Sequence, residues 1–130
     1  MQPYLDCFAY RLDSPEGSIC YSGDSGGVCP ALIALAQDCD VLIHMNHYFS
    51  GTEPTDIYRA VCGNHEDVAQ VAARANVRTL VLSHFLEQID QPGVREHIVQ
   101  EIGKTFKGHI VWGEDLMSVP LKGPKMFHMV

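Results

Sequence analysis

Three stretches of the chain repeat apolar residues at the spacing of an amphipathic helix. The first begins at Pro30, which suits the first turn of a helix. The second follows Asn64, a suitable N-cap, and ends at Asn76, which tolerates a left-handed conformation. The third begins at Pro92 and is closed by Gly108. Each predicts a helix with one face on a sheet. The apolar positions are Leu32, Leu35, Ala36 and Cys39; Val68, Val71, Ala72 and Ala75; and Val94, Ile98, Ile102 and Phe106.

Short β-prone or apolar runs lie before and between these helices. Pro15 and Gly17 interrupt the first of them and predict a hairpin loop over residues 13–17. Residues 80–82 are continuously apolar, which indicates a strand buried on both faces. Residues 45–62 have no steady period and are predicted to form a long loop. The predicted strands are 8–12, 18–21, 40–44, 77–83, 109–112 and 115–119.

The order of these elements, β-β-α-β-α-β-α-β-β, predicts a layered α/β fold. The chain has 130 residues, which is the size of one domain, and no internal repeat or linker divides it. We therefore expect a single domain over residues 1–130, with an irregular tail at 122–130.

Charge and composition narrow the classes of partner. The chain carries 9 basic and 16 acidic residues, a net charge of -7, which disfavours a nucleic-acid partner unless local positive charge or metal ions compensate. Its apolar runs are far shorter than the roughly 20 residues that span a bilayer, so no membrane partner is expected. The first ten residues show no secretory signal, so a cytoplasmic location is expected. The five cysteines include no C-x-x-C pair and are predicted to be small buried hydrophobes.

Three polar residues stand where strands end or a helix begins. Asp24 follows a glycine-rich turn, His84 follows the buried strand, and His65 starts the second helix. Carboxylate oxygen and imidazole nitrogen are ligands that zinc accepts, so Asp24 and His84 are candidate metal ligands. Each residue also has a structural alternative, because Asp24 can bond turn amides and either histidine can be an ordinary hydrogen-bonded residue. Two ligands do not close a zinc site, which normally has four.

The context of these residues resembles a known family. The runs are Tyr21-Ser22-Gly23-Asp24-Ser25-Gly26, Asp40-Val41-Leu42-Ile43-His44, Asn64-His65 and Leu80-Val81-Leu82-Ser83-His84-Phe85. In this order they resemble the carboxy-terminal half of the metallo-β-lactamase superfamily, and most closely its ribonuclease Z-like branch. The resemblance implies half of an αββα sandwich, a mixed sheet with helices packed on one face.

The resemblance also implies roles for the three residues. Asp24 would occupy the G-D-[ST] turn whose aspartate bridges two zinc ions, and His84 the L-[TS]-H-[FL] motif whose histidine binds the second metal. His65 would position or protonate the scissile group. The implied activity is metal-dependent hydrolysis of a small-molecule or phosphodiester-type substrate, with a metal-activated water as nucleophile.

Two departures from the family pattern qualify this. The H-E-A-T motif appears as His44-Met45-Asn46-His47, so the glutamate that would pair with His65 is gone. His47 taking part of that role is one interpretation, and a structural or supporting role for His44 is another. The H-x-H-x-D-H ligand cluster of the preceding half does not occur in the sequence.

The absent cluster leaves an alternative function open, in which the chain is a catalytically inactive fragment or a self-associating module. Half of a sandwich leaves one sheet face without a partner, and an exposed apolar face favours association. We therefore expect a homo-oligomer.

Overall fold

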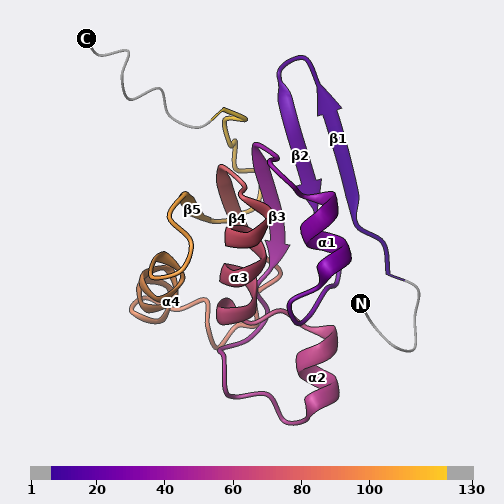
Figure 1. The fold of residues 1–130 in the computed structure, drawn as a ribbon. Helices are drawn as coiled ribbons and strands as arrows, with labels where there is room; N and C mark the ends of the chain where they lie inside the picture. Colours follow the sequence, from indigo (N-terminus) through magenta and orange to yellow (C-terminus); the bar gives the residue numbers. More distant parts are fainter. Residues whose placement is uncertain (1–6, 123–130) are drawn as a thin grey trace.

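The computed structural model describes residues 7–122, which contain a five-stranded mixed sheet in the order β1-β2-β3-β4-β5 (Figure 1). β1 (Tyr10–Ser14) and β2 (Gly17–Tyr21) form an antiparallel hairpin. β3 (Val41–Met45), β4 (Thr79–Ser83) and β5 (His109–Trp112) continue the sheet in parallel. The predicted α/β class is confirmed. Beyond Lys122, the predicted tail lies outside the described residues.

The three predicted helices are present, with shorter bounds. α1 is Pro30–Leu35, α3 is His65–Ala75 and α4 is Val94–Gly103. Asn64 caps α3 by accepting a hydrogen bond from the Asp67 N–H, and Asn76 ends it in the left-handed conformation, as predicted. α4 is shorter than predicted, because the sequence placed its start at Pro92 and its end near Gly108. Phe106 lies beyond the helix but is buried, as are Ile98 and Ile102.

A fourth helix, α2 (Asp56–Val61), lies inside the segment that was predicted to be a long loop. Thr55 starts it, because the Thr55 hydroxyl accepts a hydrogen bond from the Tyr58 N–H. None of its six residues is fully buried. The helix therefore has no apolar stripe, which is why its sequence shows no helical period.

The strand predicted at residues 115–119 is wrong. Beyond β5 the chain turns at Gly113, where a side chain would lie 2.5 Å from the Leu82 carbonyl oxygen, and it then crosses the outer face of the sheet instead of pairing with it. The predicted hairpin is confirmed, but its loop is shorter than the predicted 13–17: Ser14 pairs with Gly17, so only Pro15 and Glu16 form it. Ser14 shortens that loop, because its hydroxyl accepts from the Gly17 N–H at 3.3 Å.

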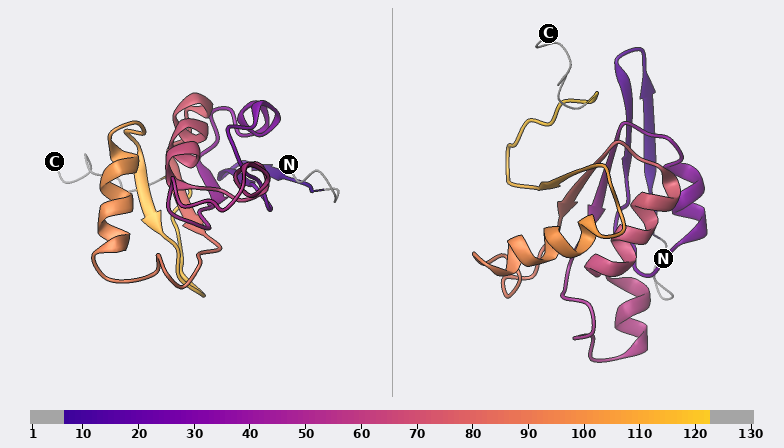
Figure 2. Two further views of the ribbon diagram at one scale, coloured as in Figure 1. Left: turned by 90° about the horizontal axis from the view of Figure 1, so that it is seen from below. Right: turned by 60° about the vertical axis from the view of Figure 1, so that its left-hand side comes forward.

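Alternate residues of the strands face opposite sides of the sheet. One side packs under α1, α3 and α4, which lie together on that face of the sheet (Figures 1 and 2). This confirms the prediction of helices on one face and of a strand β4 buried on both sides. The strand residues in this core are Cys20, Leu42, Leu80, Leu82, Ile110 and Trp112.

The opposite side, which we call the outer face, carries no helix among the described residues. Residues 113–121 cross part of it and enclose a cavity of about 520 Å³ that reaches from Ile19 and Val81 to His84. Toward β1 the face is open, and Tyr10 and Leu12 are 65% and 64% exposed. The strand residues of the outer face include Tyr10, Leu12, Ile19, Tyr21, Val41, Ile43, Thr79, Val81 and Val111.

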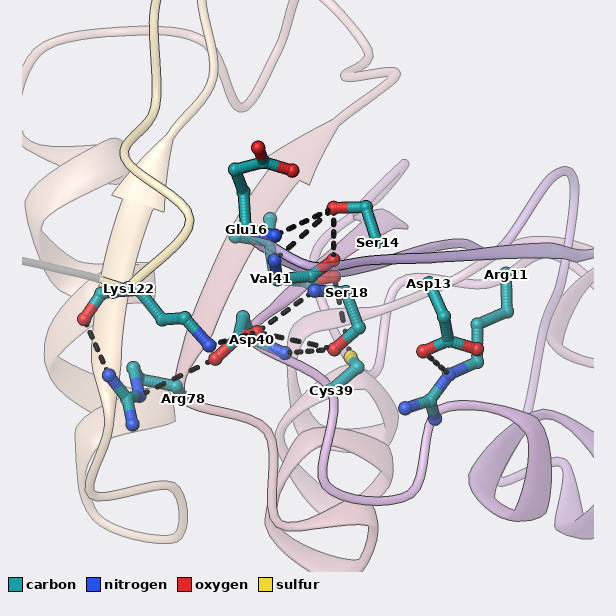
Figure 3. A network of polar contacts seen from close by, with 11 residues as sticks. Arg11, Asp13, Ser14, Glu16, Ser18, Cys39, Asp40, Val41, Arg78 and Lys122 are labelled. Carbon is teal, nitrogen blue, oxygen red and sulfur yellow. Dashed lines mark hydrogen bonds and ion pairs between the residues drawn. The ribbon is translucent and has the colours of Figure 1, made fainter.

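A polar network holds the crossing segment at the end of the sheet opposite the carboxyl ends of β3 and β4 (Figure 3). Asp40 accepts a hydrogen bond from the Ser18 N–H at 2.9 Å and lies 3.4 Å from the Lys122 Nζ. Arg78 donates to the Lys122 carbonyl at 2.7 Å. Burial would raise the pKa of Asp40, but these donors outweigh it and hold that pKa below its usual value. Asp40 therefore stays ionised and ties residue 122 to the sheet.

No helix among the described residues is long and apolar enough to cross a membrane. The cysteines of the described part are free, with Cys20 and Cys39 buried as predicted and the others partly exposed.

His44 lies on the helix side of β3, is fully buried and donates through Nδ1 to the Met45 carbonyl at 2.8 Å. Burial lowers its pKa from 6.5 to about 4. Because the folded-state pKa is the lower one, acid favours the unfolded chain, and stability is lost as pH falls from about 6.5 toward 4.

We expect the free energy of unfolding to drop by about 1.4 kcal/mol between pH 7.5 and 5.5 on account of His44 alone. His44→Leu should remove this part of the pH dependence, while the exposed-site control His109→Gln should retain it. Urea denaturation at both pH values measures the difference. An equal pH dependence in His44→Leu and the unmodified chain would contradict the assignment.

Candidate metal and catalytic site

Asp24 lies in a turn fastened to the carboxyl end of β3. The Ser22 N–H donates to the Ile43 carbonyl at 2.9 Å, and the Ser22 hydroxyl accepts from the Met45 N–H at 3.2 Å. Gly23 then takes a φ of +60°, in a place where a side chain would meet the Phe8 carbonyl oxygen. Only glycine fits both conditions. The turn therefore leads the chain away from β2 and leaves the Asp24 side chain half-exposed.

The same turn packs against the end of α2. A methyl group at Gly26 would lie 2.6 Å from the Arg59 carbonyl oxygen, so the two backbones touch there. This contact brings Cys62 near Asp24, and burial together with the Asp24 charge raises the pKa of the Cys62 thiol. The Cys62 thiol therefore stays protonated at neutral pH in the metal-free chain.

Asp24 and His84, the two ligands predicted from the sequence, lie side by side. The Asp24 Oδ1 and His84 Nε2 atoms are 3.4 Å apart. A charge-assisted hydrogen bond would be about 2.7–2.9 Å long. In contrast, two ligands on one tetrahedral zinc ion, with bonds of about 2.0–2.1 Å, are about 3.3 Å apart. The donor types and their spacing thus fit two adjacent ligands of zinc.

The rest of such a site is absent from the described part of the chain. No group of three or more histidine, cysteine, aspartate or glutamate side chains within residues 7–122 is placed to hold a metal ion. Within the described residues, Asp24 and His84 are thus a pair of candidate ligands without a third.

His84 is the first residue after β4 and has a φ of +61°. This left-handed conformation is uncommon for residues other than glycine, although histidine enters it more readily than bulkier residues. The next residue is anchored, because the Phe85 ring stacks on Trp112 with centroids 4.0 Å apart. The sharp change of direction turns the His84 ring out of the strand and toward Asp24.

His47 contacts the candidate ligand His84 rather than His65. Its Nδ1 lies 2.9 Å from the His84 carbonyl oxygen, and the His47 and His84 rings meet edge to face at 4.9 Å. The interpretation that His47 replaces the family glutamate as a partner of His65 finds no contact among the described residues. The structural interpretation of His44 fits its full burial.

His65 occupies the first turn of α3 and is only 3% exposed. Its Nδ1 lies 3.3 Å from the Ser50 hydroxyl, and its ring packs against Phe49 at 4.8 Å. Burial lowers the pKa of His65, so the ring is neutral at pH 7 and carries one N–H. Within residues 7–122 no hydrogen bond or ion pair joins His65 to Asp24 or His84.

A buried polar network that sequence reasoning missed holds the start of α3. Asp67 is 5% exposed and pairs with Arg59, with Nη2 to Oδ1 at 3.0 Å and Nε to Oδ2 at 3.2 Å. The Asn64 side-chain amide donates to Asp67 at 2.8 Å and to the Tyr48 hydroxyl at 3.1 Å. The Tyr48 ring packs edge to face against Tyr58. The position of Asp67 three residues after the N-cap was the available signal. Its partner Arg59 could not be found, because α2 was not predicted.

No protein-family model matches the chain. Curated relatives do: ribonuclease Z from Mycobacterium tuberculosis (strain H37Rv) is 30% identical over 123 residues, which cover 91% of this chain and 44% of that protein. Ribonuclease Z from Mycobacterium avium (strain 104) is 28% identical over 128 residues, which cover 95% of this chain and 45% of that protein.

Solved structures share the fold. The metallo-β-lactamase fold protein YhfI from Bacillus subtilis aligns with a TM-score of 0.73 at 21% identity, over 88% of this chain and 44% of that one. The short form of human tRNase Z aligns with a TM-score of 0.62 at 19% identity, over 87% of this chain and 36% of that one. The chain belongs to the metallo-β-lactamase superfamily. Within this superfamily its homologues are ribonuclease Z-like, as the sequence motifs predicted.

The chain spans about half the length of the curated relatives it matches. The mixed sheet with helices on one face thus corresponds to about half of a metallo-β-lactamase fold, which confirms the predicted fold class.

Arg59 provides a test of the network that places His65. Arg59→Met removes the counter-charge of a buried carboxylate, and we expect the free energy of unfolding to fall by about 1–2 kcal/mol. Arg74→Met is a matched control, because Arg74 also lies in the last turn of a helix but is exposed and has no side-chain partner among the described residues. Urea denaturation measures both, and equal losses would contradict the role of the pair.

Proposed function

We propose that this chain contributes the carboxy-terminal half of a zinc-dependent hydrolase centre, in which Asp24 and His84 are metal ligands. The observation that carries the proposal is the 3.4 Å separation of the Asp24 Oδ1 and His84 Nε2 atoms beyond the ends of β2 and β4. Its homology to ribonuclease Z supports the same assignment. The remaining ligands would come from a polypeptide segment with the H-x-H-x-D-H cluster.

Each residue has a separate task in this proposal. The Asp24 carboxylate would hold metal through its oxygens, and the half-exposed His84 ring would do so through its Nε2. His65 keeps its Nδ1 against Ser50, so its Nε2 is the nitrogen available to position or protonate the leaving group. Zinc, when bound, activates water for attack and polarises the substrate.

The substrate class that we propose is a phosphodiester or another small ester-type molecule. The printed names of the relatives concern RNA processing, but the net charge of -7 gives this chain no general attraction for a polyanion. Binding of nucleic acid would therefore depend on the metal ions and on basic residues outside this chain.

Zinc content and turnover test the assignment separately. The chain is co-expressed with the amino-terminal half of a ribonuclease Z relative that carries the H-x-H-x-D-H cluster, and zinc is measured by mass spectrometry alongside hydrolysis of bis(p-nitrophenyl) phosphate. Asp24→Asn and His84→Asn should lose zinc and activity together. His65→Ala should retain zinc and lose activity by about 10²–10⁴-fold.

His109→Asn is the control, because His109 is exposed at the start of β5 and should change neither quantity. Full zinc content in both Asp24→Asn and His84→Asn would refute the ligand assignment. Unchanged turnover in His65→Ala would refute the role of that residue alone.

The second candidate function is self-association through the outer face. The described residues include no element that covers Tyr10, Leu12 or Tyr21, which are 65%, 64% and 46% exposed. These three residues continue the apolar lining of the cavity beside Ile19 and Ile43. A contiguous apolar surface of this kind favours burial against another surface, and a second copy of the chain offers one.

Light scattering on the purified chain tests this candidate. We expect a dimer or larger oligomer, and we expect Leu12→Asp combined with Tyr21→Asp to give a monomer, because a charge cannot be buried there without a partner. Ile57→Asp is the matched control: Ile57 is 52% exposed but lies on α2, away from the outer face. A monomeric unmodified chain at micromolar concentration would exclude this function.

A further inference from the structure

His47 is held at three points by residues from different parts of the chain. Its N–H donates to the Gly63 carbonyl at 2.7 Å, just before α3. Its carbonyl accepts from the Leu86 N–H at 2.9 Å, just after β4. Its ring Nδ1 lies 2.9 Å from the His84 carbonyl oxygen. His47 thus has little freedom to move, and its ring is placed against the backbone of a candidate ligand.

His84 itself has few restraints of its own. Its side chain is 50% exposed, so burial does not fix the ring. The last ladder bond between β3 and β4 joins the Asn46 N–H to the Ser83 carbonyl, one residue before His84. The left-handed φ of +61° then takes the His84 carbonyl out of the sheet. The only hydrogen-bond donor that reaches this carbonyl within residues 7–122 is the His47 ring.

We propose that His47 is a positioning residue that holds His84 in its left-handed conformation and directs its Nε2 toward Asp24. This inference rests on the proposed function for the assignment of His84 as a zinc ligand. A carbonyl oxygen can only accept, so Nδ1 of His47 is the donor in this contact and carries a proton. The His47 and His84 rings also pack edge to face with centroids 4.9 Å apart, which restricts the orientation of the His84 ring.

His47 can position His84, which is 37 residues away in the sequence, because the loop that carries His47 is itself held in place. Its backbone bonds join the loop after β3 to the turn before α3 and to the loop after β4. The Tyr58 ring of α2 lies 6.3 Å from the His47 ring on another side. The geometry of the Asp24–His84 pair therefore depends on a residue that need not touch the metal.

The metal-free chain allows a first test. Long-range ¹H–¹⁵N spectra should show the His47 ring proton on Nδ1. In His47→Asn the amide Nδ2 branches from the same position as the ring Nδ1, so the donor and the backbone ¹³C shifts of His84 should be retained. In His47→Leu the donor is lost, and these shifts should move away from the left-handed pattern. An Nδ1 without a proton in the unmodified chain would overturn the proposal without any variant.

Zinc binding gives the second test, with zinc alone as the probe and calorimetry on the full chain. His47→Leu should bind about three- to tenfold more weakly than the unmodified chain, the effect of one lost hydrogen bond, while His47→Asn should stay within about twofold. Equal weakening in both variants would identify His47 as a ligand and overturn the positioning role. Equal affinity in all three would overturn it as well.

The two tests separate this inference from the proposed function. Loss of the left-handed ¹³C shifts of His84 in His47→Leu would support the positioning role whether or not the unmodified chain binds zinc. Failure of the unmodified chain to bind zinc would count against the proposed zinc site and not against the positioning role. Thermal unfolding of the three proteins completes the comparison, because a purely structural role would lower the unfolding midpoint of His47→Asn together with that of His47→Leu.

Discussion

The alternation of side chains along β2, β3, β4 and β5 governs the rest of this structure. In each strand one set of residues packs under the helices, and the intervening set forms the outer face. The hydrophobic effect therefore fixes the register, since a shift by one residue would place core residues such as Leu42 and Leu80 on the wrong side. Because β2, β3 and β4 are parallel, their carboxyl ends meet at one edge, and Asp24 and His84 follow two of these ends.

Loops then convert that shared edge into a defined geometry. Backbone contact at Gly26 holds the Asp24 turn against α2, while the Arg59–Asp67 pair connects α2 to the start of α3. His47 joins the same region to the loop that carries His84. The candidate site thus depends on polar contacts between segments that are distant in sequence, and the sheet supplies only its location.

The half-site and the outer face have a common physical origin. Within the described residues the sheet is covered by helices on one side only, which leaves its other side without a complementary layer, and both candidate ligands, Asp24 and His84, lie at one edge of this sheet. The relatives are about twice as long as this chain. A single partner that covered the outer face and supplied the missing zinc ligands would satisfy both requirements.

The sequence by itself determined the α/β class, the helices α1, α3 and α4, the family and the candidate pair Asp24 and His84. These features follow from local rules, because apolar periodicity, caps such as Asn64 and a glycine turn act over a few residues. Tertiary structure alone decided the rest. α2 has no buried stripe, residues 115–119 lie across the sheet instead of pairing with it, and His47 approaches His84 from 37 residues away. Such contacts depend on how separate segments pack, and no periodicity along the chain records them.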